Sequence, residues 1–258
     1  MKKAGLIISL LFCAFSAFSQ NDVKVRFGVE GGFNMSKWAG DYSDIYGTSF
    51  KPGFNGGGLA EIQINPLWSV QSEFLISMEG TKTDGGSITL CKGKKNEQTY
   101  QIPSEVDAWY FKVPIYVLYN FKVGPGRLSP GVGLYLAWAF AGSSKSASTF
   151  ADDSYFRQVN ETIKNDYKDN SQYYTDEDKH LMDLWDKCIP RRFDYGIGIK
   201  GIYELENKSL NGLFGSLGVT EGLTGCYNLN LMFSVGYKFK YNKWLRTTYN
   251  TGILEYNP

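Results

Sequence analysis

Apolar and polar residues alternate along most of this chain with a period of two. Successive side chains of a strand point to opposite faces, so the alternation predicts strands with one apolar face. In the clearest run Trp109, Phe111 and Val113 alternate with Tyr110 and Lys112. Runs of this kind occupy residues 23–34, 54–64, 68–78, 109–121, 129–140, 193–205, 213–221 and 227–239. The seventh run is less regular, because Phe214 falls on its polar side.

The connections between the eight runs alternate in length. Short connections lie at residues 65–67, 122–127 and 206–212, and long ones at 35–50, 83–107 and 143–192. The last connection, at residues 222–225, is tight. Eight strands make the smallest common closed antiparallel barrel, and short turns at one end with long loops at the other are typical of outer-membrane barrels. The pattern predicts an all-β fold, an eight-stranded antiparallel up-and-down transmembrane β-barrel.

Side-chain size indicates which face of this barrel looks outward. The same alternation fits a soluble barrel such as a lipocalin, whose apolar face lines the interior. Here the apolar faces carry Trp68, Trp109 and Trp138 with many other large residues, and an eight-stranded interior has no room for them. The opposite faces combine charges with glycines such as Gly131 and Gly133, which fit a narrow lumen. We therefore expect the apolar faces to contact lipid, with girdles of aromatic residues near the strand ends.

Composition and the N-terminus agree with an exported barrel. The 27 Lys and Arg nearly balance the 26 Asp and Glu, so there is no basic face for nucleic acid. Lys2 and Lys3 precede an apolar stretch at residues 6–18, and Ala17 and Ser19 are small residues suited to cleavage. We predict a signal peptide at residues 1–19, an outer-membrane barrel domain at 20–239 and a periplasmic C-terminal tail at 240–258.

Several segments resemble one known family when they are read in order along the chain. They are FGVEGGFNMS (27–36), FKPGFNGGGLAE (50–61), SVQSEFLISMEG (69–80), WYFKVPIYVLYNF (109–121), PGVGLYLAWAFAG (130–142), FDYGIGIKGIYEL (193–205) and FSVGYKF (233–239). The chain resembles the outer-membrane β-barrel family often called porin-like or PorT-like, which is common in Bacteroidetes. The resemblance spans residues 23–239 and implies a barrel with no established activity. Two features depart from it: the long loop at 143–192, and a chain that continues past Phe239.

The polar faces bring ten charged residues into one narrow lumen. They are Arg26, Glu30, Glu61, Glu73, Glu79, Lys112, Asp194, Lys200, Glu204 and Lys238. Such a set could form a proton or ion path, or a network of ion pairs that plugs the barrel. Buried charges need partners, and the opposing strands supply them, so we favour the structural network. Pro114 lacks an N–H group, which predicts a bulge or a gap in the pairing of its strand.

The long loop at 143–192 has helical signals, so we expect it to be partly helical and extracellular. Thr175 is followed by acidic residues that suit a helix N-terminus, and residues 155–163 suggest a second short helix. His180 lies on the first of these helices without a ligand cluster. Three cysteines follow the signal peptide, at the long-loop end of the barrel. We predict that Cys188 forms a disulfide, with Cys91 as the favoured partner and Cys226 as the other.

The sequence has no GxSxG, HExxH, P-loop or CxxC motif. We therefore expect no enzymatic activity, no catalytic or cofactor-binding residue, no metal site and no cofactor. The leading hypothesis is an integral protein of the cell outer membrane with a structural or surface-interaction role, a side-chain-filled lumen, and outer-membrane lipid as its surroundings. It would have an extracellular or periplasmic protein partner. The alternatives are a PorT-like export or assembly factor and, less favoured, a small-solute channel, an outer-membrane enzyme or a soluble ligand carrier.

Overall fold

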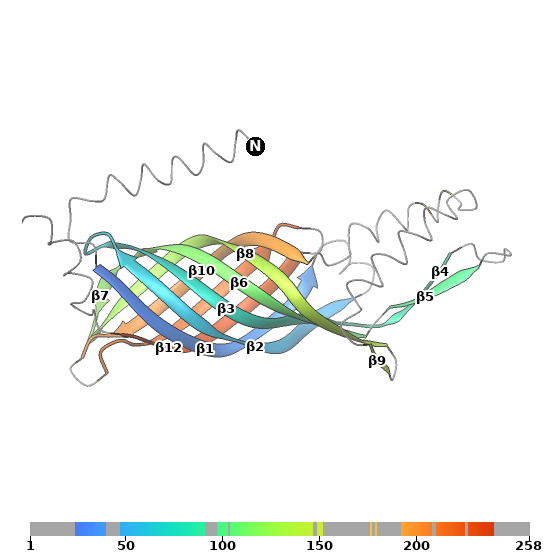
Figure 1. The fold of residues 1–258 in the computed structure, drawn as a ribbon, viewed down its shortest axis with the longest axis horizontal. Coiled ribbons are helices and arrows are strands. Elements are labelled where there is room, and N and C mark those ends of the chain that lie inside the picture. The colour runs from blue at the N-terminus through green and yellow to red at the C-terminus, as the bar shows by residue number, and fades with distance from the viewer. Residues whose placement is uncertain are drawn as a thin grey trace, which may run out of the picture.

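The computed structural model describes residues 24–39, 47–90, 97–102, 104–146, 149–151, 176, 179, 192–207, 210–224 and 227–239. Eight long strands form a closed antiparallel barrel (Figure 1). They are β1 (Lys24–Ala39), β2 (Thr48–Gln63), β3 (Trp68–Thr83), β6 (Glu105–Tyr119), β8 (Gly126–Ser146), β10 (Phe193–Leu205), β11 (Leu213–Gly222) and β12 (Tyr227–Lys238). Each pairs with the next, and β12 pairs with β1, which closes the ring. The predicted eight-stranded barrel is confirmed.

The barrel is apolar outside and polar inside. Phe33, Leu134 and Ile199 on the outer face are 74%, 67% and 64% exposed, whereas Lys112 and Lys238 on the inner face are 1% exposed. Large exposed apolar patches on this scale require an apolar or protein partner. The large apolar side chains point outward and the small and charged ones point into the lumen, as predicted from their sizes.

Short turns join the strands at one end, where local signals fix the geometry. Asn65 Oδ1 accepts hydrogen bonds from the backbone N–H groups of Leu67 and Trp68, each at 2.8 Å. The short strand β7 (Phe121–Val123) pairs with the start of β8 through a turn at Gly124. Gly124 has a φ of +57°, a conformation that glycine adopts without steric cost. These connections match the short turns expected from the sequence.

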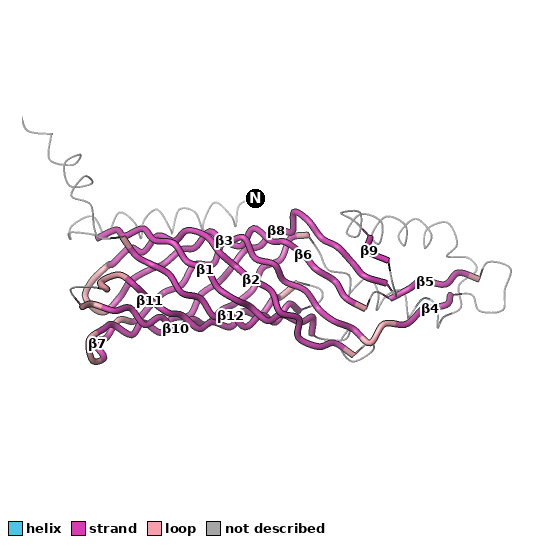
Figure 2. The backbone as a smooth tube through the Cα atoms, turned by 90° about the horizontal axis from the view of Figure 1, so that it is seen from below, coloured by secondary structure: helices cyan, strands magenta, loops and turns pink. Residues whose placement is uncertain are grey.

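The opposite end differs from the expectation of three long loops. β1 continues to Ala39, β2 starts at Thr48, and β8 runs to Ser146, where β9 (Thr149–Ala151) pairs with it. β4 (Gly86–Leu90) and β5 (Gln98–Ile102) form a separate two-stranded sheet that projects beyond the barrel (Figures 1 and 2). In these segments the apolar and polar residues no longer alternate regularly, although the backbones remain hydrogen-bonded as strands. A prediction from alternation alone therefore assigns them to loops.

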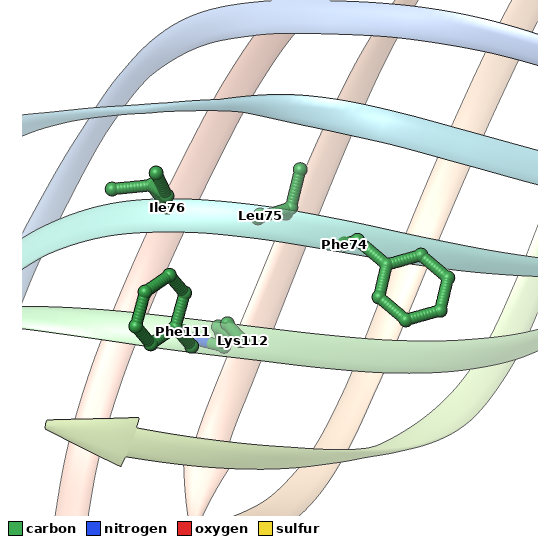
Figure 3. A pocket seen from close by; sticks show the side chains of 5 residues that line it. All are labelled: Phe74, Leu75, Ile76, Phe111 and Lys112. Atoms are coloured by element: carbon green, nitrogen blue, oxygen red, sulfur yellow. The ribbon is translucent and has the colours of Figure 1, made fainter.

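Pro114 lies beside a gap in the pairing, as predicted. The ladder between β3 and β6 is interrupted after the pair Ser72↔Ile115 and resumes at the pair Leu75↔Lys112. An outward-facing hollow of about 210 Å³ lies just beside this gap (Figure 3). The exposed side chains of Phe74, Ile76 and Phe111 border it.

Several predicted features fall outside the described residues. These are the signal peptide at 1–19, the tail at 240–258, the helix at 155–163 and the cysteines Cys91, Cys188 and Cys226. Of the helix predicted after Thr175, only Asp176 and Lys179 are described; both are helical, and their side chains lie 3.4 Å apart. Within the described residues, no helix has the length and apolar character to cross a membrane.

Candidate functional site: the charged lumen

The inward-facing side chains fill the lumen with charged clusters at successive heights. All ten charged residues singled out from the sequence are described, and all are buried or half-buried on the inner face. We name three groups by their distance from the short turns: a lower, a middle and an upper cluster. Each draws residues from strands that are not neighbours in the barrel, so the contacts cross the lumen.

The lower cluster contains Arg26, Glu61, Arg127, Glu204 and Lys238. Glu61 accepts hydrogen bonds from Lys238 Nζ at 2.6 Å, Arg26 at 2.8 Å and Arg127 at 3.0 Å. Glu204 accepts from Arg26 at 2.5 Å and from Arg127 at 2.7 Å. Three cations thus face two carboxylates, and hydrogen bonds to ionised groups are among the strongest in proteins.

The middle cluster contains Glu30, Glu73 and Lys200. Lys200 Nζ lies 3.0 and 3.1 Å from the two oxygens of Glu30 and 2.5 Å from Glu73 Oε1. Gln71 Nε2 also donates to Glu73 Oε1, at 2.6 Å. Here two carboxylates share a single ammonium group, the reverse of the balance in the lower cluster.

The upper cluster is built around Glu79. This carboxylate accepts hydrogen bonds from Lys112, Asn230 and Ser77, each at 2.8 Å, and from Asn228. Lys112 Nζ also donates to Thr220 at 3.0 Å and lies 4.3 Å from the centre of the Tyr135 ring. The cluster therefore has one carboxylate and one ammonium group, each with several polar neighbours.

Asp194 lies near the upper cluster but is held by hydroxyl groups. Tyr135 donates to Asp194 Oδ2 at 2.7 Å, and Thr224 donates to Oδ1 at 2.5 Å. Among the described ion pairs, Asp194 has none, so it differs from the other nine predicted lumen residues. An apolar cluster of buried residues includes Tyr135, whose ring faces Lys112; it contains Trp38, Val106, Ala108, Tyr110, Tyr135, Ala137 and Ala139.

Arg127 is a central lumen residue that is not among the ten charged residues expected from the sequence. It lies in the connection expected at 122–127, yet it bridges Glu61 and Glu204. The alternation carries a signal for it, because Arg127 is two and four positions before the inward-facing Ser129 and Gly131. Lys51 was also missed; it lies at the rim, 2.7 Å from Asp107 and 3.2 Å from Glu105.

The arrangement supplies ion pairs rather than a recognisable reaction centre. Each carboxylate that lies in an ion pair has at least one oxygen engaged by a Lys or Arg donor, and Glu73 Oε2 is left without a hydrogen-bond partner. Within the described part of the chain, no group of three or more His, Cys, Asp or Glu side chains is placed to hold a metal ion. The chemistry that the geometry supports is mutual charge stabilisation among buried side chains of a narrow interior.

Solved structures that match this chain at low sequence identity include several outer membrane proteins. Ail, the attachment invasion locus protein of Yersinia pestis, was solved with the heparin analogue sucrose octasulfate; it is 10% identical, with 84% of this chain and 99% of that chain covered and a TM-score of 0.39. Neisserial surface protein A is 13% identical, with coverages of 83% and 97% and a TM-score of 0.37. OprG from Pseudomonas aeruginosa is 12% identical, with coverages of 84% and 96% and a TM-score of 0.38.

A comparison with curated proteins finds no match. The sequence itself matches the family described as "Outer membrane protein beta-barrel domain" over residues 18–228, which is more than half of the chain. This match agrees with the closed barrel and its apolar outer face. The chain therefore belongs to the outer membrane protein beta-barrel domain family and resides in the outer membrane.

Proposed function

We propose that this protein is a non-enzymatic, non-conducting barrel that anchors a projecting surface structure in the outer membrane. In this role the apolar outer face contacts outer-membrane lipid. The lumen network, from Arg26 and Lys238 near the short turns up to Lys112 and Asp194, stabilises the walls. The contact surface for an extracellular partner is the end that carries the long connections.

The observation that carries this proposal is the extension of the strand ladder beyond the closed ring. The pairing of β8 with β10 ends at Trp138↔Phe193, yet β8 continues to Ser146. On its other side β8 stays paired with β6 as far as Glu105↔Lys145. β4 and β5 lie further out, in a sheet of their own. The extension adds nothing to the ion pairs of the lumen, but it holds surface loops on a rigid scaffold, where binding residues are commonly found.

Closure of the lumen supports the non-conducting part of the proposal. An eight-stranded barrel is only wide enough for its own side chains. Here Tyr116, Tyr135 and Phe214 add bulk to the ion pairs, and each of them is at most 2% exposed. An ion that entered would have to displace partners from buried charges, at a cost of several kcal/mol for each charge.

Planar-bilayer recording of the purified protein tests closure. We expect no stable, large, ohmic openings, while a wide porin reconstituted in the same bilayers serves as the positive control. Stable openings in the unmutated barrel would mean that the lumen is wet and that the small-solute channel is the better account.

Site-specific photo-crosslinking in intact cells tests the contact role. A crosslinker at Thr89 of β4 should capture a surface partner, and the same group at Lys122 in the short turn serves as the matched control. The second candidate, a PorT-like export or assembly factor, requires a periplasmic partner, and the basic residues Lys240, Lys243 and Arg246 favour it. Capture from Lys122 and not from Thr89 would support that candidate instead.

A further inference from the structure

The middle cluster has one more carboxylate than its cations can balance. Glu30, Glu73 and Lys200 are 6%, 0% and 3% exposed, so water screens their charges little. Lys200 makes ion pairs to both carboxylates. If both were ionised, a net negative charge would be buried in the centre of the barrel, where an unbalanced charge costs several kcal/mol.

No other cation of the described lumen is placed to neutralise this charge. The neighbours of Glu30 on β2 and β12 are Gly57 and Gly236. Glu73 lies opposite Leu59 on β2, and Lys200 lies between Gly131 on β8 and Gly218 on β11. The other cations make their ion pairs elsewhere: Lys112 with Glu79 above, and Arg26, Arg127 and Lys238 with Glu61 and Glu204 below. The lower cluster has one cation more than it has carboxylates, but none of its described ion pairs reaches Glu30 or Glu73. Asp194 adds a further carboxylate at the outer end.

Three of the buried polar atoms without a hydrogen-bond partner lie at the same level. Glu73 Oε2, Gln71 Oε1 and the hydroxyl oxygen of Tyr116 have no hydrogen-bond partner in the structure, although all three residues are fully buried. Tyr116 of β6 lies directly opposite Gln71 of β3, and its O–H is a donor that reaches neither of these two acceptors. Buried acceptors without donors are costly, so Glu73 Oε2 and Gln71 Oε1 lack a donor in a cluster that also lacks a positive charge.

A proton supplies both missing elements. Bound to a carboxylate oxygen of Glu30 or Glu73, it removes one negative charge and leaves a single carboxylate for the ammonium group of Lys200. It also converts one acceptor into an O–H donor, which can hydrogen-bond to the other carboxylate. Two carboxyl groups that share one proton are a known arrangement wherever two like charges meet.

We infer that the Glu30–Glu73 pair is a proton-binding site, and that the folded barrel keeps one proton there at neutral pH. The proton comes from solvent as the chain folds and returns to solvent when the chain unfolds, so no other reactant is needed. Lys200 remains protonated throughout and holds the pair together.

Infrared spectroscopy of the folded protein in lipid vesicles at pH 7 tests the site directly. A protonated carboxyl group gives a C=O stretch that is separate from the carboxylate bands and moves to lower frequency in D2O. We expect this band in the unmutated barrel, and we expect Glu73→Gln and Glu30→Gln to remove it. Glu79→Gln is the matched control, because Glu79 is equally buried but has its own ammonium partner; it should leave the band in place. Asp194→Asn should leave it as well.

The dependence of stability on pH gives a second readout that does not require the variants to be as stable as the parent. Because the folded state would bind one proton more than the unfolded chain, the unfolding free energy falls as pH rises above the ordinary carboxyl range. The equilibrium constant for folding should fall by up to about tenfold per pH unit between pH 6 and 8. This slope should be reduced in Glu73→Gln and unchanged in the double variant Glu79→Gln/Lys112→Met, which removes a balanced ion pair and leaves no lone ammonium group behind.

The outcomes separate the proton from other ways of balancing the charge. The proposal is wrong if the unmutated barrel has no carboxylic-acid band from the pair and no slope assigned to it. It is also overturned if the band is absent but the melting temperature rises when sodium replaces N-methylglucamine at constant ionic strength, because the pair would then hold a metal cation. A band that persists in both Glu→Gln variants would assign the proton to another carboxyl group and would equally overturn it.

Discussion

At the scale of single residues, the number of partners decides how much each lumen charge matters. Glu79 has a single ammonium partner, Lys112. In the lower cluster, by contrast, Glu61 and Glu204 share three cations, so the loss of one leaves a balanced set. Charged residues that look alike in the sequence therefore differ in how much stability the barrel loses when one of them is removed.

Lys112→Met should be one of the most damaging single substitutions in the barrel. It leaves Glu79 buried with amide and hydroxyl donors but without a positive charge. We expect the unfolding free energy to fall by about 3–5 kcal/mol, measured by urea titration in lipid vesicles with tryptophan fluorescence. The matched variant Arg26→Met should cost clearly less, because Arg127 and Lys238 still neutralise Glu61 and Glu204. Equal losses in the two variants would contradict this account of the clusters.

Close contacts at the inner face make some glycines irreplaceable and others not. A Cβ atom on Gly57 would lie 1.9 Å from the carbonyl oxygen of Phe74, so Gly57→Ala must move one strand against the next. We expect it to lower the unfolding free energy by about 1–3 kcal/mol, the usual cost of overpacking. Gly215→Ala is the control, since nothing lies within 4 Å of the added atom. Its midpoint in the same titration should stay close to that of the parent.

The alternation along each strand predicts most of the side chains that face the lumen, but it does not predict which of them form ion pairs with each other. Alternation placed Lys200 and Glu30 on the inner face without a structure. Their contact joins β10 to β1, which are not adjacent strands, so no spacing along the chain encodes it. The lumen position of Arg127 is not predicted, because the Gly-Pro-Gly sequence immediately before it is typical of a turn and not of a strand.

At the scale of elements, strand positions followed from alternation and strand ends did not. β3 and β10 begin at the same residues as the apolar runs, Trp68 and Phe193. Their first outward-facing residues already contact the apolar surroundings. The outer ends of β1, β2 and β8 were underestimated, because residues such as Lys37 and Ser49 break the apolar face while their backbones remain paired. The alternation of apolar and polar residues depends on the surroundings of the side chains, whereas strand ends depend on backbone hydrogen bonds.

The β4–β5 sheet should be dispensable for folding of the barrel. It pairs only with itself among the described strands, and the ladder between β3 and β6 closes below it at Lys82↔Glu105. Replacing residues 86–102 with two glycines should leave the heat-modifiable folded band on gels and the midpoint of unfolding nearly unchanged. Loss of the folded band would show that the sheet takes part in barrel assembly. The same variant should lose any crosslink or cell-surface contact made through β4.

At the scale of the whole molecule, an even number of strands brings both ends of the barrel chain to the same side. Lys24 pairs with Gln63 beside the short turn at 64–67, and the backbone N–H of Lys238 donates to Gly212 in the short connection at 206–212, so both ends lie with the short turns. For this family of barrels, short turns face the periplasm. An epitope inserted in residues 143–192 should be labelled on intact cells, and one placed after Phe239 should be labelled only after the membrane is opened. The reverse result would invert the barrel and the proposed contact surface with it.

The pairing of β1 with β12 has a consequence for the order of events in biogenesis. Each residue from Gly28 to Ala39 has its partner some two hundred positions later in the chain, between Tyr227 and Lys238. Synthesis and export deliver the N-terminal strand first, so its edge must wait for the last strand before the cylinder can close. Throughout that interval the chain carries alternating aromatic residues and an unpaired edge, which favour aggregation. Delivery to the membrane therefore has to keep this edge from pairing with other chains until the final strand arrives.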